Sequence, residues 1–184
     1  KLQDDGFYTL SIGATDMGTG CDTILAQMAA ECLECDVDNI ITQSVDTDAS
    51  PYDTGSYASA TTYVTGMAVV KTCEELKKQM LREAAILLEV DEEHITFDGS
   101  MLRAVENAKE ISLADFANRC FAGGKGECLI ASASHCSPTS PPPFMAGIAE
   151  VDVDKLTGEI TLVDYAAVVD CGTIINPNLA RIQT

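Results

Sequence analysis

Two turns rich in glycine and hydroxyl side chains offer the clearest chemistry in this sequence. The first turn, residues 15–20, directly follows an apolar, strand-like run, and the second, residues 50–61, directly precedes a long helical run. The N-terminus of a helix carries unpaired N–H groups and a partial positive charge, so it attracts anions. Two such turns in one chain predict a ligand that carries phosphate. The candidate ligand-binding residues are Gly18, Thr19, Gly20, Ser56, Ser59 and Thr61.

Each turn also has a purely structural interpretation. Gly18 and Gly20 lack the Gly-x-Gly-x-x-Gly spacing of a dinucleotide-binding fold and the lysine of a P-loop, so a plain strand-to-helix turn would explain them. Asp16 and Asp22 flank this turn and would repel a bare phosphate unless their carboxylates point away. In the second turn a single hydroxyl would be explained as a helix cap, whereas three hydroxyls would not. The sequence leaves both interpretations open.

Composition limits the partners that such a chain can bind. The 184 residues include 11 Lys and Arg against 29 Asp and Glu, for a formal net charge of -18. Nucleic acids and anionic membrane surfaces would repel this chain, because both are bound through basic groups. A bound phosphate would therefore be held mainly by backbone N–H groups and hydroxyls. No apolar run reaches the roughly 20 residues that cross a bilayer and the first residues have no signal-peptide core, so we expect a cytoplasmic protein.

Eight cysteines raise the alternatives of disulfides or a metal site. The chain is long and 46% hydrophobic, which favours reduced thiols within an ordinary core. Cys32 and Cys35 form a single Cys-x-x-Cys pair, whereas a zinc or iron–sulfur site needs about four ligands in paired spacing. Cys120, Cys128 and Cys136 are too widely spread to supply the second pair. We therefore predict no metal ligand, and a cysteine-ligated metal protein stays as a rival interpretation.

Strands and helices must alternate to position the two turns. Alternation with period two predicts strands, and apolar residues at helical spacing predict helices. Several prolines within 138–143 predict an irregular stretch. The pattern indicates a single α+β unit over residues 1–184. Turn residues at 98–100 and at 154–158 predict hairpins between the strands that flank them, and Ser112 is expected to cap the helix that follows it. The expected strands are 7–13, 40–45, 95–97, 101–104, 128–134, 144–153 and 159–169, and the expected helices are 22–35, 56 to about 90, and 113–121.

Several short motifs follow one another in a fixed order along nearly the whole chain. They are Asp-Met-Gly-Thr-Gly at 16–20, Asp-Thr-Asp at 46–48, Gly-Ser-Tyr-Ala-Ser at 55–59, Gly-Met-Ala at 66–68, Ala-Glu-Val-Asp-Val-Asp at 149–154, and Asp-Cys-Gly at 170–172 with Asn176-Pro177 and Gln183. In this order and spacing they resemble the molybdopterin-binding subunit of the xanthine dehydrogenase and aldehyde oxidoreductase family of molybdenum hydroxylases. The resemblance implies an α+β segment of a molybdenum cofactor-binding domain, truncated at both ends.

The resemblance also implies a chemistry. Enzymes of this family oxidise purines, other N-heterocycles or aldehydes with oxygen taken from water. Their cofactor is molybdopterin, often in the cytosine dinucleotide form in bacteria, and the protein gives the molybdenum no direct ligand. Gly18, Thr19 and Gly20 would lie on the first loop that contacts the cofactor, where many members carry Gln in place of Thr19.

Further cofactor contacts follow from the same resemblance. Ser56, Ser59 and Thr61 match the hydroxyl positions that hold the pterin and the phosphate end of the cofactor. Gln183 matches a glutamine that also contacts the cofactor, and Tyr57 is a weaker candidate. The seven expected cofactor-binding residues are thus Gly18, Thr19, Gly20, Ser56, Ser59, Thr61 and Gln183.

No catalytic residue is expected in this chain. The family's general base is a glutamate in a Gly-x-Gly-Glu motif far downstream of the loop at 170–177. The stretch 124–127, Gly-Lys-Gly-Glu, looks similar but lies upstream of that loop, so we interpret it as a decoy. The chain is then a piece of a longer oxidoreductase, inactive and without cofactor by itself. Its partners would be the remainder of the molybdopterin subunit, iron–sulfur and FAD domains or subunits, and a small heterocycle or aldehyde substrate. The other rival interpretation is an acidic interaction module without cofactor.

Overall fold

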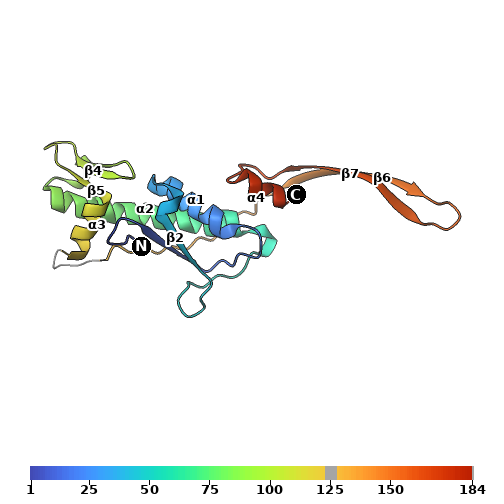
Figure 1. Cartoon of the computed structure of the whole chain (residues 1–184), viewed down its shortest axis with the longest axis horizontal. Helices are drawn as coiled ribbons and strands as arrows, with labels where there is room; N and C mark the ends of the chain where they lie inside the picture. Colours follow the sequence, from blue (N-terminus) through green and yellow to red (C-terminus); the bar gives the residue numbers. More distant parts are fainter. Residues whose placement is uncertain (123–127, 184) are drawn as a thin grey trace. The chain divides into compact units, whose positions relative to one another are not determined.

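The computed structural model describes residues 1–122 and 128–183 (Figure 1). The chain divides into two compact units, Lys1–Ser137 and Pro138–Thr184. Helices occur together with small sheets in the chain, which confirms the α+β class predicted from the sequence. The stretch 124–127, interpreted above as a decoy, lies outside the described residues.

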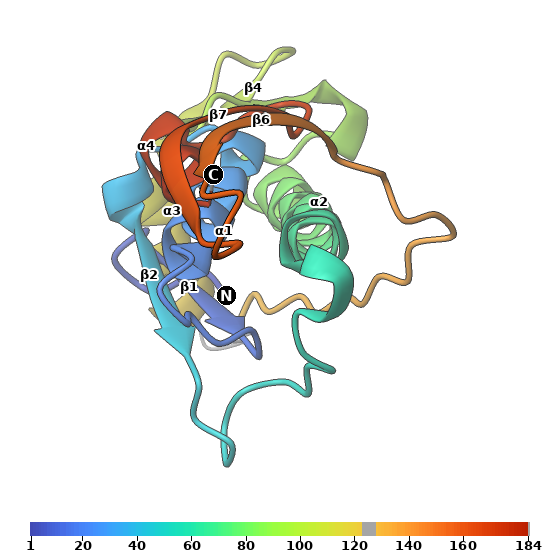
Figure 2. The same ribbon diagram turned by 90° about the vertical axis from the view of Figure 1, so that its right-hand side faces the viewer.

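The first unit begins with two parallel strands joined by a helix. Strand β1 (Tyr8–Ile12) pairs with β2 (Ile40–Ser44), and α1 (Cys21–Leu33) and a 3-10 turn (Val37–Asn39) connect them. Parallel strands need such a crossover because the chain must return to its starting end. A long helix, α2 (Thr61–Leu88), packs along α1 (Figures 1 and 2).

The core of this unit lies between the strand pair and the two helices. On β1, Tyr8 and Ile12 are buried whereas Ser11 is exposed, as expected of a strand with one face on a core. On α2, the buried residues recur at steps of three and four, which is the spacing of one helix face. They are Gly66, Val69, Cys73, Leu76, Met80, Ala84, Ala85 and Leu88.

A three-stranded antiparallel sheet follows α2 and a 3-10 turn (Glu92–His94). Its strands are β3 (Ile95–Phe97), β4 (Met101–Ala104) and β5 (Glu110–Ser112), arranged in chain order. The hairpin predicted around 98–100 is therefore confirmed.

Helix α3 (Leu113–Ala122) begins at the capping serine expected from the sequence. The Asp115 N–H donates to Ser112 Oγ at 3.1 Å, and the Ser112 hydroxyl donates to Asp115 Oδ2 at 2.7 Å. Phe116 on this helix is fully buried, so α3 contributes to the same core.

The second unit contains a long hairpin and a short helix. Strand β6 (Phe144–Val153) pairs antiparallel with β7 (Ile160–Asp170), as predicted, and α4 (Pro177–Ile182) follows. The Asn176 side chain caps α4 by accepting hydrogen bonds from the two N–H groups at 178 and 179. All side chains of β6 are exposed, and so are those of β7 except Val169.

Two expected elements differ from the structure. The long helix begins at Thr61 and not at 56, because Ala58 and Ser59 have left-handed φ angles of 53° and 57° inside a 3-10 turn, Tyr57–Ser59. The strand expected over 128–134 belongs to no sheet among the described residues. A backbone hydrogen bond of 3.1 Å ties its start to the rest of the unit, from the Leu2 N–H to the carbonyl at 129.

Candidate cofactor site

The two candidate turns lie at the same end of the first unit. Cys32 Sγ donates to the Val70 carbonyl at 3.8 Å, across a separation of 38 residues. Gly66 follows Met28 by the same interval, and a Cβ on Gly66 would lie 2.6 Å from Met28 Cε. A constant interval means that α1 and α2 run in parallel and in register. The start of α1 is therefore level with the turn that precedes α2 (Figure 1).

The carboxyl ends of both parallel strands reach this end as well. Ile12 is opposite Ser44 where the strands finish, and the Ser44 hydroxyl donates to Asp22 Oδ2 in the first turn of α1 at 2.9 Å. The loop after β2 returns over Gly13, where an added Cβ would lie 2.2 Å from the Pro51 carbonyl oxygen. In open α/β sheets ligands bind at the carboxyl ends of parallel strands, and both candidate turns follow such ends here.

In the first turn, a carboxylate occupies the backbone donors. The Gly18 and Gly20 N–H groups donate to Asp16 Oδ1 at 2.8 and 3.1 Å. The pKa of Asp16 is lowered by these bonds, the one from Gly20 most strongly. Asp22 is held by Ser44, so the two flanking carboxylates are part of the turn's own hydrogen bonding. An anion would not find these two amides free.

In the second turn, the hydroxyls do not cap the helix. Ser56 Oγ and Thr61 Oγ1 share a hydrogen bond of 2.6 Å, and both residues are half-buried. The N-cap residue of α2 is Ala60, and no side chain caps the helix there. The capping explanation of these hydroxyls is therefore wrong. Ser59 is exposed in a left-handed conformation that costs about 1–2 kcal/mol for a residue other than glycine.

Gln183 belongs to the second unit. It directly follows α4, its N–H donates to the Ala180 carbonyl at 3.1 Å, and its side chain is exposed. The structure thus brings six of the seven expected cofactor residues together within one unit. The cofactor role of all seven stays a prediction.

Sequence reasoning did not assign a role to the aspartates whose carboxylates hold the candidate turns. Asp53 accepts from the Gly55 N–H at 2.7 Å and from the Thr65 hydroxyl at 3.3 Å, and thereby ties the second loop to α2. Asp170 accepts from the Gly172 N–H at 3.0 Å in the same way. The signal was present as the spacing Asp-x-Gly at 16–18, 53–55 and 170–172, because an aspartate readily bonds the backbone two residues later.

Burial disfavours Cys32, Cys35 and Cys73 as metal ligands in this fold. All eight are free, and burial raises the pKa of Cys32 and Cys35 and raises that of Cys73 to about 12. Metals bind the thiolate, which such burial disfavours. Among the described residues, the group that brings three potential ligand atoms within 4.8 Å of one another is Asp16, Cys21 and Asp22. No helix in the described part of the chain is both long and apolar enough to span a membrane.

The first unit thus begins with a β-α-β arrangement that places the glycine turn and the hydroxyl turn after its two strands, and the chain has few basic side chains. Residues 1–184 match the family described as Molybdopterin cofactor-binding domain. The chain belongs to this family.

Known relatives and solved structures agree with this membership. The chain is 35% identical to "Probable hypoxanthine oxidase XdhD" of Escherichia coli K12, over 98% of this chain and 19% of that protein. It is 32% identical to a xanthine dehydrogenase molybdenum-binding subunit of E. coli O157:H7, over 99% of this chain and 25% of that protein. A structure of reconstituted CO dehydrogenase from Oligotropha carboxidovorans superimposes with a TM-score of 0.77 at 26% identity, over all of this chain and 23% of the other. The chain therefore spans about a fifth to a quarter of these relatives.

Proposed function

We propose that this chain forms one wall of the molybdopterin site in a longer molybdenum hydroxylase. The observation that carries the proposal is the common position of the glycine turn before α1 and the hydroxyl turn before α2, at one end of a parallel helix pair. The relatives are named as a hypoxanthine oxidase, a xanthine dehydrogenase subunit and a CO dehydrogenase, which supports redox chemistry for the whole protein.

The donors of the second turn fit the pterin and phosphate end of such a cofactor. Ser56 and Thr61 have two hydroxyl hydrogens and use one of them between themselves, so one hydroxyl hydrogen can donate elsewhere. Ser59 is exposed next to them, and the positive end of the α2 dipole carries no side-chain cap. Hydroxyls and a helix N-terminus can hold an anion without lysine or arginine, which suits a chain of net charge -18.

The first turn fits a different contact. A Cβ added to Gly18 would meet nothing within 4 Å, so no other described residue covers the turn at this position. Because Asp16 holds the amides of Gly18 and Gly20, the cofactor would be contacted through the Thr19 hydroxyl and the backbone surface that the glycines expose. This turn would position the cofactor rather than neutralise its phosphate.

The rest of the enzyme lies outside these residues. We propose that Gln183 is a further cofactor contact, that both units belong to one cofactor-binding domain, and that the cofactor is the cytosine dinucleotide form. The bound cofactor would supply the oxidation chemistry, and the general base would come from another part of the polypeptide.

We expect iron–sulfur and FAD groups as redox partners, a small heterocycle or aldehyde as substrate, and a cytoplasmic location, in keeping with eight free thiols. The chain alone would not retain the cofactor.

Removing the two serine hydroxyls tests the proposal in the longer enzyme. The double variant Ser56→Ala/Ser59→Ala should lower molybdenum and pterin content at least about tenfold, because each hydrogen bond to a charged group contributes roughly 1.5–3 kcal/mol and the loss of one bond already weakens binding by that factor. Molybdenum is measured by elemental analysis and pterin by the fluorescence of its oxidised form. Unchanged content in the variant, or no molybdenum in the parent protein, would contradict the proposal.

Ser112→Ala is the matched control for a nonspecific loss of stability. This serine does cap a helix, α3, and its removal should cost about 1 kcal/mol of stability. The control should nevertheless keep its full cofactor content, because Ser112 lies on β5, outside the two candidate turns.

A further inference from the structure

The outer edge of β1 is covered for only part of its length. Residues Lys1–Gln3 lie antiparallel to this edge, with Leu2 opposite Tyr8. The Thr9 N–H donates to the Lys1 carbonyl at 2.9 Å, and the Lys1 amino group donates to the Thr9 carbonyl at 3.0 Å. The backbone groups of Thr9 therefore point away from β2.

Further along β1, the same edge is open. Backbone groups alternate along a strand, so the N–H and C=O of Ser11 point the same way as those of Thr9, and Gly13 directly follows the end of β1. Among the described residues, no hydrogen bond joins the backbone of Ser11 or Gly13 to a partner on this side. Both residues line a cavity of about 610 Å³ in the first unit.

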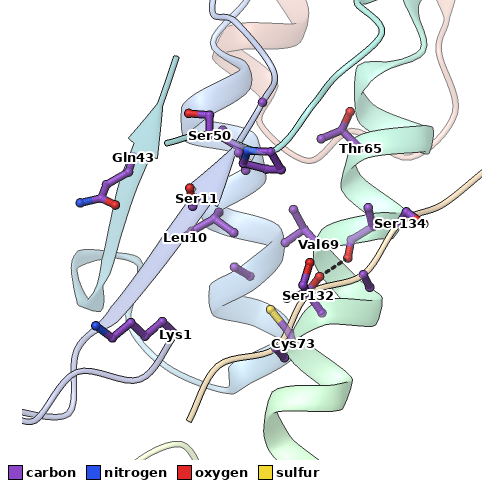
Figure 3. A pocket seen from close by; sticks show the side chains of 18 of the residues that line it. Lys1, Leu10, Ser11, Gln43, Ser50, Thr65, Val69, Cys73, Ser132 and Ser134 are labelled. Atoms are coloured by element: carbon purple, nitrogen blue, oxygen red, sulfur yellow. Dashed lines mark hydrogen bonds between the residues drawn. The ribbon is translucent and has the colours of Figure 1, made fainter. Parts of the chain in front are cut away.

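The other walls of the cavity continue the track of Lys1–Gln3. The Leu2 N–H donates to the Leu129 carbonyl, so Leu2 lies between β1 and the segment that begins at 129. The next residues of that segment, 130–135, line the side of the cavity opposite β1, and residues of α1, of α2 and of the loop 49–54 line the rest (Figure 3). Figure 3 shows these walls with Leu10 and Ser11 on β1, Val69 and Cys73 on α2, and Ser132 and Ser134.

The cavity also leaves a buried polar group without a partner. The phenol oxygen of Tyr8, a cavity-lining residue that is 2% exposed, has no hydrogen-bond partner among the described residues. A buried hydroxyl without a partner is costly, so this wall of the cavity is not fully satisfied by the described residues.

We propose that this cavity receives the stretch of the longer polypeptide that precedes Lys1, as a third strand antiparallel to β1. The relatives are four to five times longer than the matched region, and we take part of that additional polypeptide to precede Lys1. The strand would hydrogen-bond to Ser11 and Gly13 on one side and would give the segment 130–135 the ladder partner that it lacks on the other.

The register of Leu2 opposite Tyr8 fixes which residues meet. The residue immediately before Lys1 lies opposite Leu10, the second before it lies opposite Ser11, and the third lies opposite Ile12. Leu2 is 0% exposed and shares the helix-facing side with Tyr8 and Ile12. We therefore expect apolar side chains at the first and third positions before Lys1.

Amide hydrogen exchange in the longer protein tests the proposal. The Ser11 and Gly13 amides should exchange at least about 100-fold more slowly than exposed loop amides, like those of the β1–β2 ladder. Exchange at the rate of an exposed loop would overturn the proposal. Cofactor content is not part of this readout, so the result is independent of the proposed function.

Two proline variants identify the occupant. Ser11→Pro removes an N–H that the β1–β2 ladder does not use, and should speed exchange at Gly13 about tenfold, whereas Ser11→Ala keeps the N–H and should leave it unchanged. Proline at the second position before Lys1 should have the same effect as Ser11→Pro. If that variant leaves a protected Gly13 amide unchanged, another segment or a second copy fills the cavity and the proposal is wrong.

Discussion

The two units of this chain bury apolar surface to very different degrees. In Lys1–Ser137, side chains from the strands and from α1, α2 and α3 form one contiguous core. In the second unit no described side chain is buried, and Phe144, Ile148 and Val168 are 67%, 75% and 74% exposed. A lone two-stranded hairpin is marginal in water, and large exposed apolar patches mark contact surfaces. We therefore expect the first unit to carry its own stability and the hairpin to depend on cover from the longer protein.

The largest expected effect comes from the core of the first unit. Phe116→Ala removes a fully buried ring and should lower the free energy of unfolding by about 3–5 kcal/mol. The matched change in the hairpin, Phe144→Ala, should cost less than about 1 kcal/mol in the 184-residue chain, because that ring is mostly exposed. Urea unfolding followed by circular dichroism measures both. Equal losses in the two variants would remove the distinction between the units.

Two glycines with positive φ angles make a second, smaller comparison. Gly99 has φ +85°, and an added Cβ would lie 1.7 Å from the Glu34 carbonyl oxygen, whereas Gly158 has φ +77° and open space around it. Gly99→Ala should therefore cost more than about 2 kcal/mol, from strain together with displaced backbone, and Gly158→Ala only about 1 kcal/mol, from strain alone. Thermal unfolding of both variants checks this, and a cost at Gly158 as large as that at Gly99 would contradict it.

The sequence could predict the elements that depend on local pattern. The apolar periodicity of β1, α1 and α2 and the turn residues at 98–100 and 154–158 are local signals, and each corresponds to an element or turn of the structure. The order of the motifs predicted the family, which the comparison over residues 1–184 confirmed. The bond between Ser56 and Thr61 could not be predicted, because it depends on left-handed angles at Ala58 and Ser59, two residues that rarely adopt them.

Features that depend on contacts between distant parts of the chain could not be predicted from the sequence either. The apolar pattern of 128–134 is typical of a strand, but a strand forms only where a neighbour supplies hydrogen bonds, and the described residues supply one only at its start. Likewise, the residues of β6 and β7 predict strands but do not reveal which surface covers them. The parallel register of α1 and α2, which brings the two candidate turns together, follows from the close packing of Met28 on Gly66.

The smallest expected effect concerns the pKa values of two turn aspartates, one in each unit, and tests whether a turn alone lowers them. Asp16 in the first unit and Asp154 in the hairpin turn are both exposed, and both accept backbone N–H bonds. The pKa of Asp16 is lowered, mainly by the bond from Gly20, and that of Asp154 mainly by the bond from Leu156. A lowered pKa in the folded state means that the stabilisation is present above the ordinary value of about 3.9 and is lost as the pH falls through the folded value. Carboxyl-carbon NMR titration should therefore give midpoints below about 3.9 for both residues, and in Asp16→Asn the Gly18 amide shift should no longer follow this titration. The opposite result would be a titration midpoint at about the ordinary value for Asp154 and a lowered one for Asp16. It would mean that a turn of this kind needs a packed core beneath it. The difference between the two units would then include their turns as well as their cores.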